Sequence, residues 1–297
     1  MAMPILLAIT VLIFCIRALV PGDPVEIMFF GESPPQEVVE RIRASWGLDR
    51  PIYEQYLIYI GRVVRGDFGL SYRSREPVAE EIFARFPRTL TLAVCGLTLG
   101  LAVGLLAGIV SAVKQNSAFD LGSMMVALAG VSMPSFWLGL LLIYFFSVRW
   151  RLLPPMGSGT WQHLVLPSVT LGLLTASVIA RLTRSSMLEV LRQDYVRTAR
   201  AKGLSERVVV YKHSLRNALI PVITVVGLQF GALLGGAFIT ETVFAYPGLG
   251  QLGVNAIRNR DFPIIQGVLL TVCTFYVSIN LLVDLVYGFI NPRISYR

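Results

Sequence analysis

The chain has 297 residues, of which 55% are hydrophobic and only 15% are charged, and its mean hydropathy is +0.66. Soluble domains usually carry about 25% charged residues, so these values exclude an ordinary soluble domain. The apolar runs are long enough to cross a bilayer core of about 30 Å as helices, whereas a β-barrel would show alternating segments of roughly ten residues. The sequence therefore predicts an all-α integral membrane protein embedded in a lipid bilayer.

The formal net charge of +8 does not indicate a nucleic-acid partner. Basic residues in the cytoplasmic loops of a membrane protein fix its orientation, and that is the simpler explanation. Cys15, Cys95 and Cys273 each lie inside an apolar run, which argues against disulfides and against a metal site. His163 and His213 have no companions at ligand spacing. We therefore expect no metal ion and no cofactor bound by this chain.

Six apolar runs predict six transmembrane helices. In chain order they cover residues 4–20, 88–113, 124–148, 164–182, 217–242 and 264–290. The predicted domains are a first span at 1–20, a helical extracytoplasmic insertion at 21–87, and a core of five spans at 88–297.

The insertion at 21–87 carries helix-start signals. Ser33 opens a capping-box pattern, Asp49 is placed to cap a second helix, and a third short helix is expected to begin at Pro77. We therefore expect this segment to be folded.

Glycines recur at every fourth residue in two of the predicted spans. They are Gly96, Gly100, Gly104 and Gly108 in one span, and Gly227, Gly231 and Gly235 in another. On a helix this spacing makes a smooth face that another backbone can approach closely. Two interpretations stay open, a sliding or pore-lining face and tight static packing.

The loop 183–216 carries the largest group of basic residues. They are Arg184, Arg192, Arg197, Arg200, Lys202, Arg207, Lys212 and Arg216. The excess of Lys and Arg predicts that this loop and both chain termini are cytoplasmic.

Within that loop, residues 194–202 are predicted to form a short charged helix that cannot span a membrane, followed by Gly203 at the usual position of a left-handed cap. One interpretation is an ordinary solvated loop. The small residues Thr198, Ala199 and Ala201 favour the other, a helix on which a partner protein docks.

Several segments, in order, resemble the permeases of binding-protein-dependent ABC importers, specifically the dipeptide/oligopeptide/nickel branch. They are "VPGDP" (20–24), "GLDRPIYEQY" (47–56), "GDFGLSYRSREPVAEEI" (66–82), "LPSVTLG" (166–172), "ARLTRSSMLEVL" (180–191), "DYVRTARAKGLSERVVVYKHSLRNALIPV" (194–222), "ETVFAYPGLGQL" (241–252), "RDFPIIQG" (260–267) and "NLLVDLVYGFINPRI" (280–294). Glutathione-importer permeases are among the most similar. The general Glu-Ala-Ala signature is replaced here by Arg197, Thr198 and Ala199, and Pro221 comes later than the signature places its proline; both departures are typical of the peptide branch.

The resemblance implies the type I ABC importer permease fold in a bacterial inner membrane. It also implies a second homologous permease, two ABC ATPase subunits and a periplasmic solute-binding protein. The solute would be a dipeptide, an oligopeptide, glutathione or a nickel chelate. Further residues before the first span are usual in the family, so the chain is expected to be truncated or to have a misassigned start.

No G-x-x-x-x-G-K-[ST] phosphate loop occurs in the sequence, so ATP and Mg²⁺ are expected in partner subunits and the permease is expected to be non-catalytic. The resemblance identifies a coupling segment at residues 194–203 that receives force from the ATPases. Its predicted site residues are Asp194, Tyr195, Arg197, Thr198, Ala199, Arg200, Ala201, Lys202 and Gly203.

Polar residues within spans are functional candidates by default. Glu241 either faces the translocation pathway or caps a loop at the interface, and Gln229 is a candidate pathway residue. For Asp284, an internal hydrogen bond with Asn280 is favoured over solute contact. The proline- and glycine-containing loop that follows is a candidate gate, and its predicted residues are Tyr246, Pro247 and Gly248.

The sequence favours two other functions less. An ion-coupled secondary transporter would need ionisable residues near the middle of a span, where only Asp284 qualifies, and an inverted repeat, which is not evident. An intramembrane serine protease would need a histidine at membrane depth, and neither His163 nor His213 is placed there.

Overall fold

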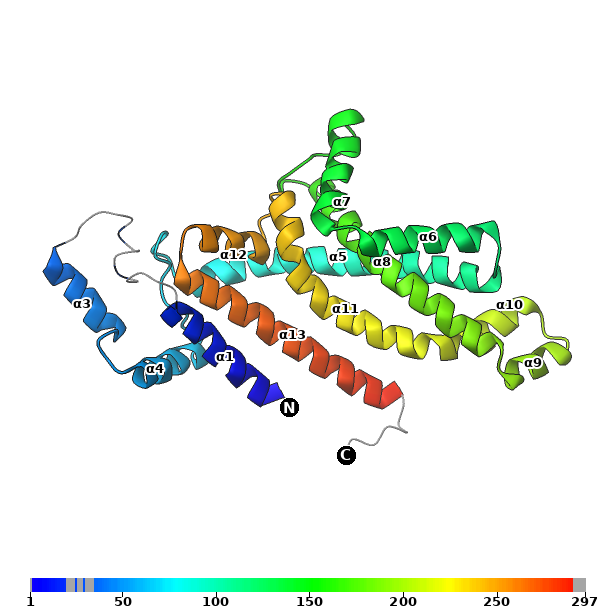
Figure 1. Cartoon of the computed structure of the whole chain (residues 1–297), viewed down its shortest axis with the longest axis horizontal. Coiled ribbons are helices and arrows are strands. Elements are labelled where there is room, and N and C mark those ends of the chain that lie inside the picture. Colours follow the sequence, from blue (N-terminus) through cyan, green and yellow to red (C-terminus); the bar gives the residue numbers. More distant parts are fainter. Residues whose placement is uncertain (1, 20–24, 26–28, 30–34, 291–297) are drawn as a thin grey trace. The chain divides into compact units, whose positions relative to one another are not determined.

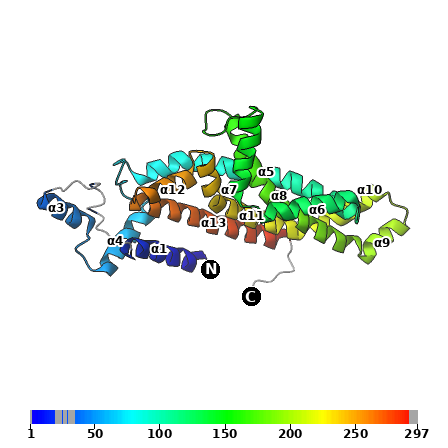
Figure 2. The ribbon, with the colours of Figure 1, turned by 45° about the horizontal axis from the view of Figure 1, so that its top comes forward.

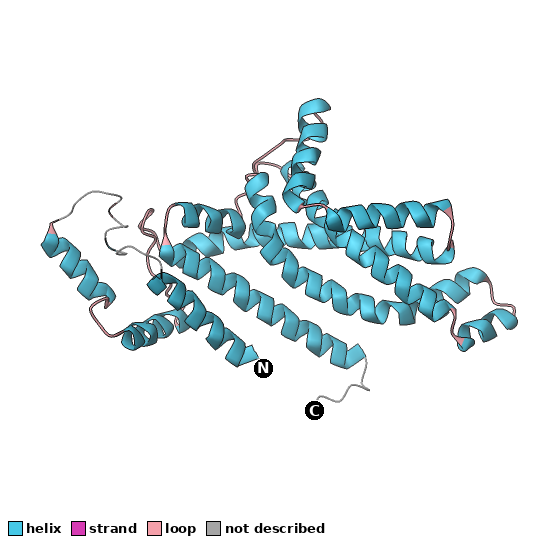
Figure 3. Ribbon diagram, in the orientation of Figure 1, coloured by secondary structure: helices cyan, strands magenta, loops and turns pink. Residues whose placement is uncertain are grey.

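The computed structural model of the chain describes residues 2–19, 25, 29 and 35–290. Its regular elements are helices (Figure 3). They divide into two compact units. Unit 1 comprises Met1–Thr89 and Pro247–Val277, and unit 2 comprises Leu90–Tyr246 and Ser278–Arg297.

The two units share two long helices. Helices α5 (Val78–Val113) and α13 (Phe262–Ile290) begin in unit 1 and end in unit 2. The other helices of unit 1 are α1 (Ala2–Leu19), α3 (Gln36–Trp46), α4 (Ile52–Val64) and α12 (Leu249–Arg258). Those of unit 2 are α6 (Ala118–Ser132), α7 (Ser135–Leu142), the π-helix η1 (Ile143–Arg149), α8 (Gln162–Leu191), α9 (Asp194–Ala201), α10 (Glu206–Val208), the π-helix η2 (Val209–Ser214) and α11 (Leu215–Val243) (Figure 1).

In unit 1, α1 packs on α4 through aromatic rings. The ring of Phe14 lies 5.4 Å from that of Tyr56 and 5.8 Å from that of Tyr59, measured between centroids. The hydroxyls of Thr10 and Tyr56 share a hydrogen bond of 2.9 Å. The amphipathic helix α4 thus packs its aromatic side chains on the first apolar helix.

The predicted start signals of the insertion are only partly right. Helices α3 and α4 exist, but each begins directly after a proline, Pro35 or Pro51, and neither N-cap makes a side-chain hydrogen bond. The predicted Asp49 cap is therefore wrong. Pro51 occupies the N-cap position in an extended conformation, and the helix starts one residue later, at Ile52. Ser33 lies outside the described residues.

The third short helix expected at Pro77 is not separate. Helix α5 starts at Val78 and continues through Pro87 to Val113. The predicted boundary between residues 87 and 88 therefore lies inside one helix.

The prediction of six spans is not confirmed by length and composition. Four helical segments qualify among the described residues, namely Val78–Val113, Gln162–Leu191, Glu206–Gly235 and Phe262–Leu285. The predicted span 124–148 is broken into α6 and the continuous helix Ser135–Arg149, which meet at an angle of 111°. The break has a local cause, since Pro134 adopts φ −61° and ψ 136° and cannot continue a helix. The first apolar helix, Met3–Cys15, is shorter than the four.

The first glycine ladder is a packing face between α5 and α8. A Cβ added at Gly100 would lie 2.7 Å from Thr175 Cβ, and one at Gly108 would lie 2.6 Å from Thr183 Cβ and 2.7 Å from the carbonyl oxygen of Ala180. Backbone and side chains of α8 fill this face, so the packing interpretation is confirmed and the pore-lining interpretation is wrong for α5.

The second ladder, on α11, is less uniform. A side chain at Gly227 would collide with Val283 of α13, whereas one at Gly235 would meet nothing within 4 Å among the described residues. The Gly227 end of this ladder is therefore a close helix contact, and the Gly235 end is not one among the described residues.

Replacing Gly104 with alanine should destabilise the protein, because the new Cβ would lie 2.8 Å from both the Ala176 carbonyl oxygen and Ile179 Cβ. Overpacking of this kind costs about 1–3 kcal/mol and should lower the thermal unfolding midpoint of the purified transporter.

The matched control is Gly122→Ala on α6, where a Cβ would meet nothing within 4 Å among the described residues. Because alanine is the better helix former, this variant should unfold at the parent midpoint or slightly above it. Equal midpoints for the two variants would contradict the close α5–α8 packing.

Candidate functional site

The coupling segment folds as the sequence predicts. Helix α9 runs from Asp194 to Ala201, and Gly203 follows with φ +79°. The N–H of Gly203 donates to the Arg200 carbonyl at 2.9 Å, and the N–H of Leu204 donates to the Ala199 carbonyl at 3.4 Å. This pair of bonds is a Schellman motif, which needs a left-handed residue and so explains the glycine.

Two buried apolar side chains pack α9 against α8 and η2. Val196 is 0% and Ala199 is 7% exposed, and both cluster with Val209 of η2 and with Val190 and Leu191 at the end of α8. Ala199 therefore lies on the inner face of α9. Val196 and Val209 were not predicted from the sequence, although the spacing of residues 196 and 199 marks one face of a helix.

A hydrogen bond at one end and an ion pair at the other also hold the coupling segment in place. Asn217 of α11 donates to the Tyr195 hydroxyl at 2.8 Å. Arg200 forms two bonds to the Glu206 carboxylate, at 2.7 and 3.1 Å, and this partner raises the pKa of the Arg200 guanidinium above its ordinary value. The ion pair bridges α9 and α10 across the loop of Gly203.

The outer face of α9 remains open to a partner. Its exposed residues in the coupling segment are Asp194, Tyr195, Arg197, Thr198, Arg200, Ala201, Lys202 and Gly203. Figures 1 and 2 show α9 and α10 together at one end of unit 2. Six of the nine predicted coupling residues thus lie on the exposed surface of α9, Lys202 and Gly203 are exposed at its end, and only Ala199 is turned inward.

The chain returns from the coupling segment through a π-helix. Residues 209–214 form η2, in which the Ser214 hydroxyl donates to the Val209 carbonyl at 3.0 Å. Val210 of η2 packs with Met187 of α8 and Ala218 of α11 in a second buried cluster. Both sides of α9 are therefore joined to long helices, α8 before it and α11 after it.

A buried ion pair ties α6 to α8. Asp120, whose side chain is 4% exposed, accepts from Arg184 Nε at 2.6 Å and from Arg184 Nη2 at 2.8 Å, and it also accepts from the N–H of Asn116 at 2.9 Å. Sequence reasoning counted Arg184 only as an orienting charge. The partners are 64 residues apart, so no local spacing could have paired them.

The predicted pathway residues occupy different environments. Gln229 on α11 is half-buried, Glu241 is 0% exposed, and Asp284 on α13 is exposed. Nearby on α13, Asn280 Oδ1 is buried and has no hydrogen-bond partner among the described residues.

The predicted gate loop follows a hydrogen-bonded turn at the C-terminal end of α11. The N–H of Tyr246 donates to the Glu241 carbonyl at 2.8 Å, and Ala245 adopts φ +46°. Tyr246 is buried and Pro247 is half-buried, and the boundary between the two units falls between them; Gly248 is the N-cap of α12 in unit 1.

Within the part of the chain that the structure describes, no group of three or more His, Cys, Asp or Glu side chains is placed to hold a metal ion. The three cysteines are free, with Cys15 exposed and Cys95 and Cys273 half-buried.

Comparison with known proteins decides the family. The family model "Binding-protein-dependent transport system inner membrane component" matches residues 104–296, and the N-terminal model of such membrane components matches residues 1–93. The chain belongs to this family. It is the membrane permease of an ABC importer, a non-catalytic, multi-pass inner-membrane component.

The permease is similar to curated relatives over nearly its whole length. It is 49% identical over 294 residues to the glutathione transport system permease protein GsiC of Escherichia coli (strain K12), covering 99% of this chain and 96% of the relative. It is 48% identical over 294 residues to the protein of the same name from Shigella flexneri serotype 5b (strain 8401), with the same coverage.

Solved structures support the fold of the permease. The MetNI methionine ABC transporter in an inward-facing conformation matches with a TM-score of 0.62 and 20% identity, covering 71% of this chain and 96% of that chain. An amino acid ABC transporter with histidines matches with a TM-score of 0.54 and 15% identity, covering 72% and 94%. The type I importer permease fold is therefore confirmed.

Replacing Asp120 with alanine should destabilise the permease by about 1–3 kcal/mol, because it leaves the partly buried Arg184 guanidinium without its carboxylate. Thermal unfolding of the purified transporter measures this loss. The control is Glu37→Ala, which removes an ion pair with Arg41 whose side chains are 85% and 82% exposed, so its effect should stay within about 0.5 kcal/mol. Equal effects of the two substitutions would show that the Asp120–Arg184 pair does not stabilise the α6–α8 contact.

Proposed function

We propose that this permease imports small peptides, with glutathione among its solutes. It does so together with a homologous second permease, two ABC ATPase subunits and a periplasmic solute-binding protein. The observation that carries the proposal is the 49% identity to glutathione permeases over 294 residues. The solved transporters for methionine and amino acids are only 15–20% identical and bear on the fold alone.

The proposed orientation places both termini and the coupling segment in the cytoplasm. The basic residues of the loop 183–216 support this placement. Residues 21–87 would then form an extracytoplasmic insertion, and residues 88–297 would form the core of the permease. Helix α12, on the loop that follows α11, would lie on the outer side with the insertion.

The proposed energy source is ATP with Mg²⁺ in the ATPase subunits. The exposed face of α9 would dock on an ATPase, and its inner face, through Val196 and Ala199, would pass the motion to α8 and η2. The permease then alternates between inward-open and outward-open states through movements of rigid helices, and the ATPase subunits drive this two-state transition. The permease itself performs no covalent step.

The proposed pathway includes Gln229 and Asp284, with the loop from Tyr246 to Gly248 as its gate. Gln229 and Asp284 are at least partly accessible. Glu241 is 0% exposed, so its carboxylate would need a movement of α11 to reach a solute.

Uptake of labelled glutathione into membrane vesicles tests the function. Vesicles that hold the whole transporter should accumulate glutathione only with the binding protein and ATP. Vesicles without the ATPase subunits should accumulate none above background. Accumulation driven by a proton gradient alone would reject the proposal and favour a secondary transporter.

Replacing Gly203 with valine tests the coupling segment. A β-branched residue at φ +79° costs about 1–2 kcal/mol and should distort the end of α9. We expect ATP hydrolysis to continue while uptake falls at least about tenfold, as for an element that couples two sites.

Gly66→Val is the matched control, since Gly66 has φ +78° and, like Gly203, no atom within 4 Å of an added Cβ among the described residues. It follows α4 in unit 1, so it should carry a similar strain without uncoupling. Normal uptake by Gly203→Val would refute the role of the coupling segment.

A further inference from the structure

Unit 1 contains a polar depression of about 750 Å³ that the transport scheme above does not use. We call it the arginine depression, because arginines outnumber carboxylates in its lining. The charged lining residues are Arg73, Arg85, Arg258, Glu81 and Asp261. They come from the loop before α5, the first turns of α5, and α12 with the turn that follows it. The volume lies in the ordinary range of ligand sites, about 300–1,000 Å³.

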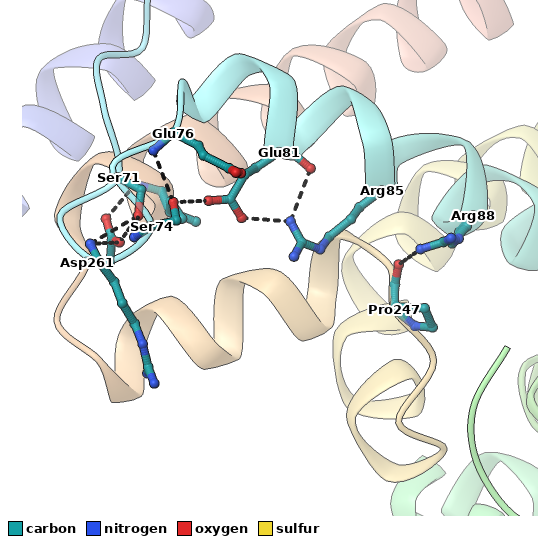
Figure 4. A network of polar contacts seen from close by, with 10 residues as sticks. Ser71, Ser74, Glu76, Glu81, Arg85, Arg88, Pro247 and Asp261 are labelled. Atoms are coloured by element: carbon teal, nitrogen blue, oxygen red, sulfur yellow. Dashed lines mark hydrogen bonds and ion pairs between the residues drawn. The ribbon is translucent and has the colours of Figure 1, made fainter.

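A buried aspartate fixes the wall formed by the loop (Figure 4). Asp261 is 2% exposed and accepts the Ser71 hydroxyl at 2.6 Å and the N–H of Arg73 at 3.3 Å. Ser71 is itself 1% exposed, and its hydroxyl oxygen accepts the N–H groups of Arg73 and Ser74 at 3.2 and 3.0 Å. Donors of the loop thus engage the Asp261 carboxylate and fix the backbone that carries Arg73.

The walls formed by α5 and α12 are fixed as well. The Glu81 carboxylate accepts the Ser74 hydroxyl at 2.7 Å and Arg85 Nη1 at 2.8 Å, so Glu81 and Arg85 neutralise each other (Figure 4). The Thr89 hydroxyl accepts the N–H of Leu249 at 2.7 Å, which holds the start of α12 against α5.

Two guanidinium groups of the lining are not engaged. The side chains of Arg73 and Arg258 are exposed, and neither makes an ion pair or a side-chain hydrogen bond among the described residues. Asn255 and Asn259 line the depression beside Arg258, and their side-chain amides likewise make no hydrogen bond in the described part of the chain. The depression therefore offers an anion two cationic groups and two amide donors on fixed walls.

The depression lies where two membrane-spanning stretches begin. Residues 89–113 of α5 and 262–283 of α13 carry no charged side chain, and both helices are long and apolar enough to span a bilayer. Arg85 precedes residue 89 by about 6 Å along a helix, and Asp261 directly precedes residue 262. The headgroup zone on each side of a bilayer is about 5–7 Å thick. Both residues, and with them the depression, therefore lie at the level of phospholipid headgroups.

We propose that the arginine depression binds the phosphate group of an anionic phospholipid from the adjacent leaflet. Arginine pairs with phosphate through two parallel hydrogen bonds, and basic pockets beside membrane-spanning helices suit anionic headgroups. Arg73 and Arg258 would hold the phosphate, and the amides of Asn255 and Asn259 would donate to the other headgroup oxygens.

The open rim favours a lipid over a free anion. A site for a small molecule from solution usually buries roughly 70–90% of the ligand, whereas Arg73, Asn255 and Arg258 are exposed. A lipid is already held at this depth by its acyl chains, so its headgroup has a high local concentration and needs fewer contacts. The cationic groups of the rim select an anionic lipid over a zwitterionic one.

Native mass spectrometry of the purified transporter, titrated with short-chain phosphatidylglycerol, tests the site. The double variant Arg73→Gln with Arg258→Gln should raise the Kd of this lipid by at least about tenfold, because each lost charge-assisted hydrogen bond is worth roughly that factor. Short-chain phosphatidylcholine, with the same acyl chains and no net charge, should bind the parent and the variant equally weakly. The same spectra give the mass of the transporter and so show that the variant is assembled.

The matched control is Arg41→Gln with Arg65→Gln, which removes the same charge from two exposed residues of unit 1 outside the depression. Its Kd for phosphatidylglycerol should stay within about twofold of the parent, as expected for exposed charges away from the site. Inorganic phosphate should displace the lipid from the parent only far above the lipid Kd, because free phosphate lacks the acyl chains that hold a lipid beside the depression.

Four results would overturn the proposal. They are an unchanged Kd in the depression variant, an equal loss in the control variant, and equal Kd values of the two lipids in the parent, which need no variant. The fourth is displacement of phosphatidylglycerol by inorganic phosphate near the lipid Kd, which would assign the depression to free phosphate. If the double variant does not assemble, the single variants Arg73→Gln and Arg258→Gln should each still raise the Kd, and an unchanged value in both would count against the site.

Discussion

The burial of Val196 and Ala199 against Val209 is the contact on which the functional account depends. An eight-residue helix is too short to be stable by itself in water, and most of the α9 surface is polar. Its structure must therefore come from packing on the ends of α8 and η2. In the proposed function, the same packing would pass a force on the outer face of α9 to α8 and, through η2, to α11.

The other helices of unit 2 that contact α8 are packed closely against it. The glycines of α5 bring its backbone against α8 so closely that a single added methyl group would collide at Gly100, Gly104 or Gly108. The Asp120–Arg184 pair then fixes α6 to the same helix. Helix α8 is thus the element that α5, α6 and the coupling segment all contact. In the proposed function, it would carry a displacement that begins at α9.

Much of this arrangement could be predicted from sequence, where the cause is local. The limits of the coupling segment follow from helix formers and from Gly203, and the glycine ladder follows from a spacing of four residues. The break at Pro134 was missed because hydropathy averages over a proline. The Asp120–Arg184 pair and the inward direction of Ala199 depend on tertiary contacts. Of these two features, only the inward direction of Ala199 has a local signal, the spacing of Val196 and Ala199. The Asp49 cap failed because Pro51 sets the helix start.

The central claim is that α9 moves together with α11 when ATP binds. Spin labels at Arg197 on the exposed face of α9 and at Arg216 near the start of α11, in a protein without its three native cysteines, measure the distance between these helices in the assembled transporter. The account predicts that this distance and its distribution stay the same with and without a nonhydrolysable ATP analogue. A clear shift or broadening of the distribution on nucleotide binding, in a labelled transporter that still imports its solute, would contradict it.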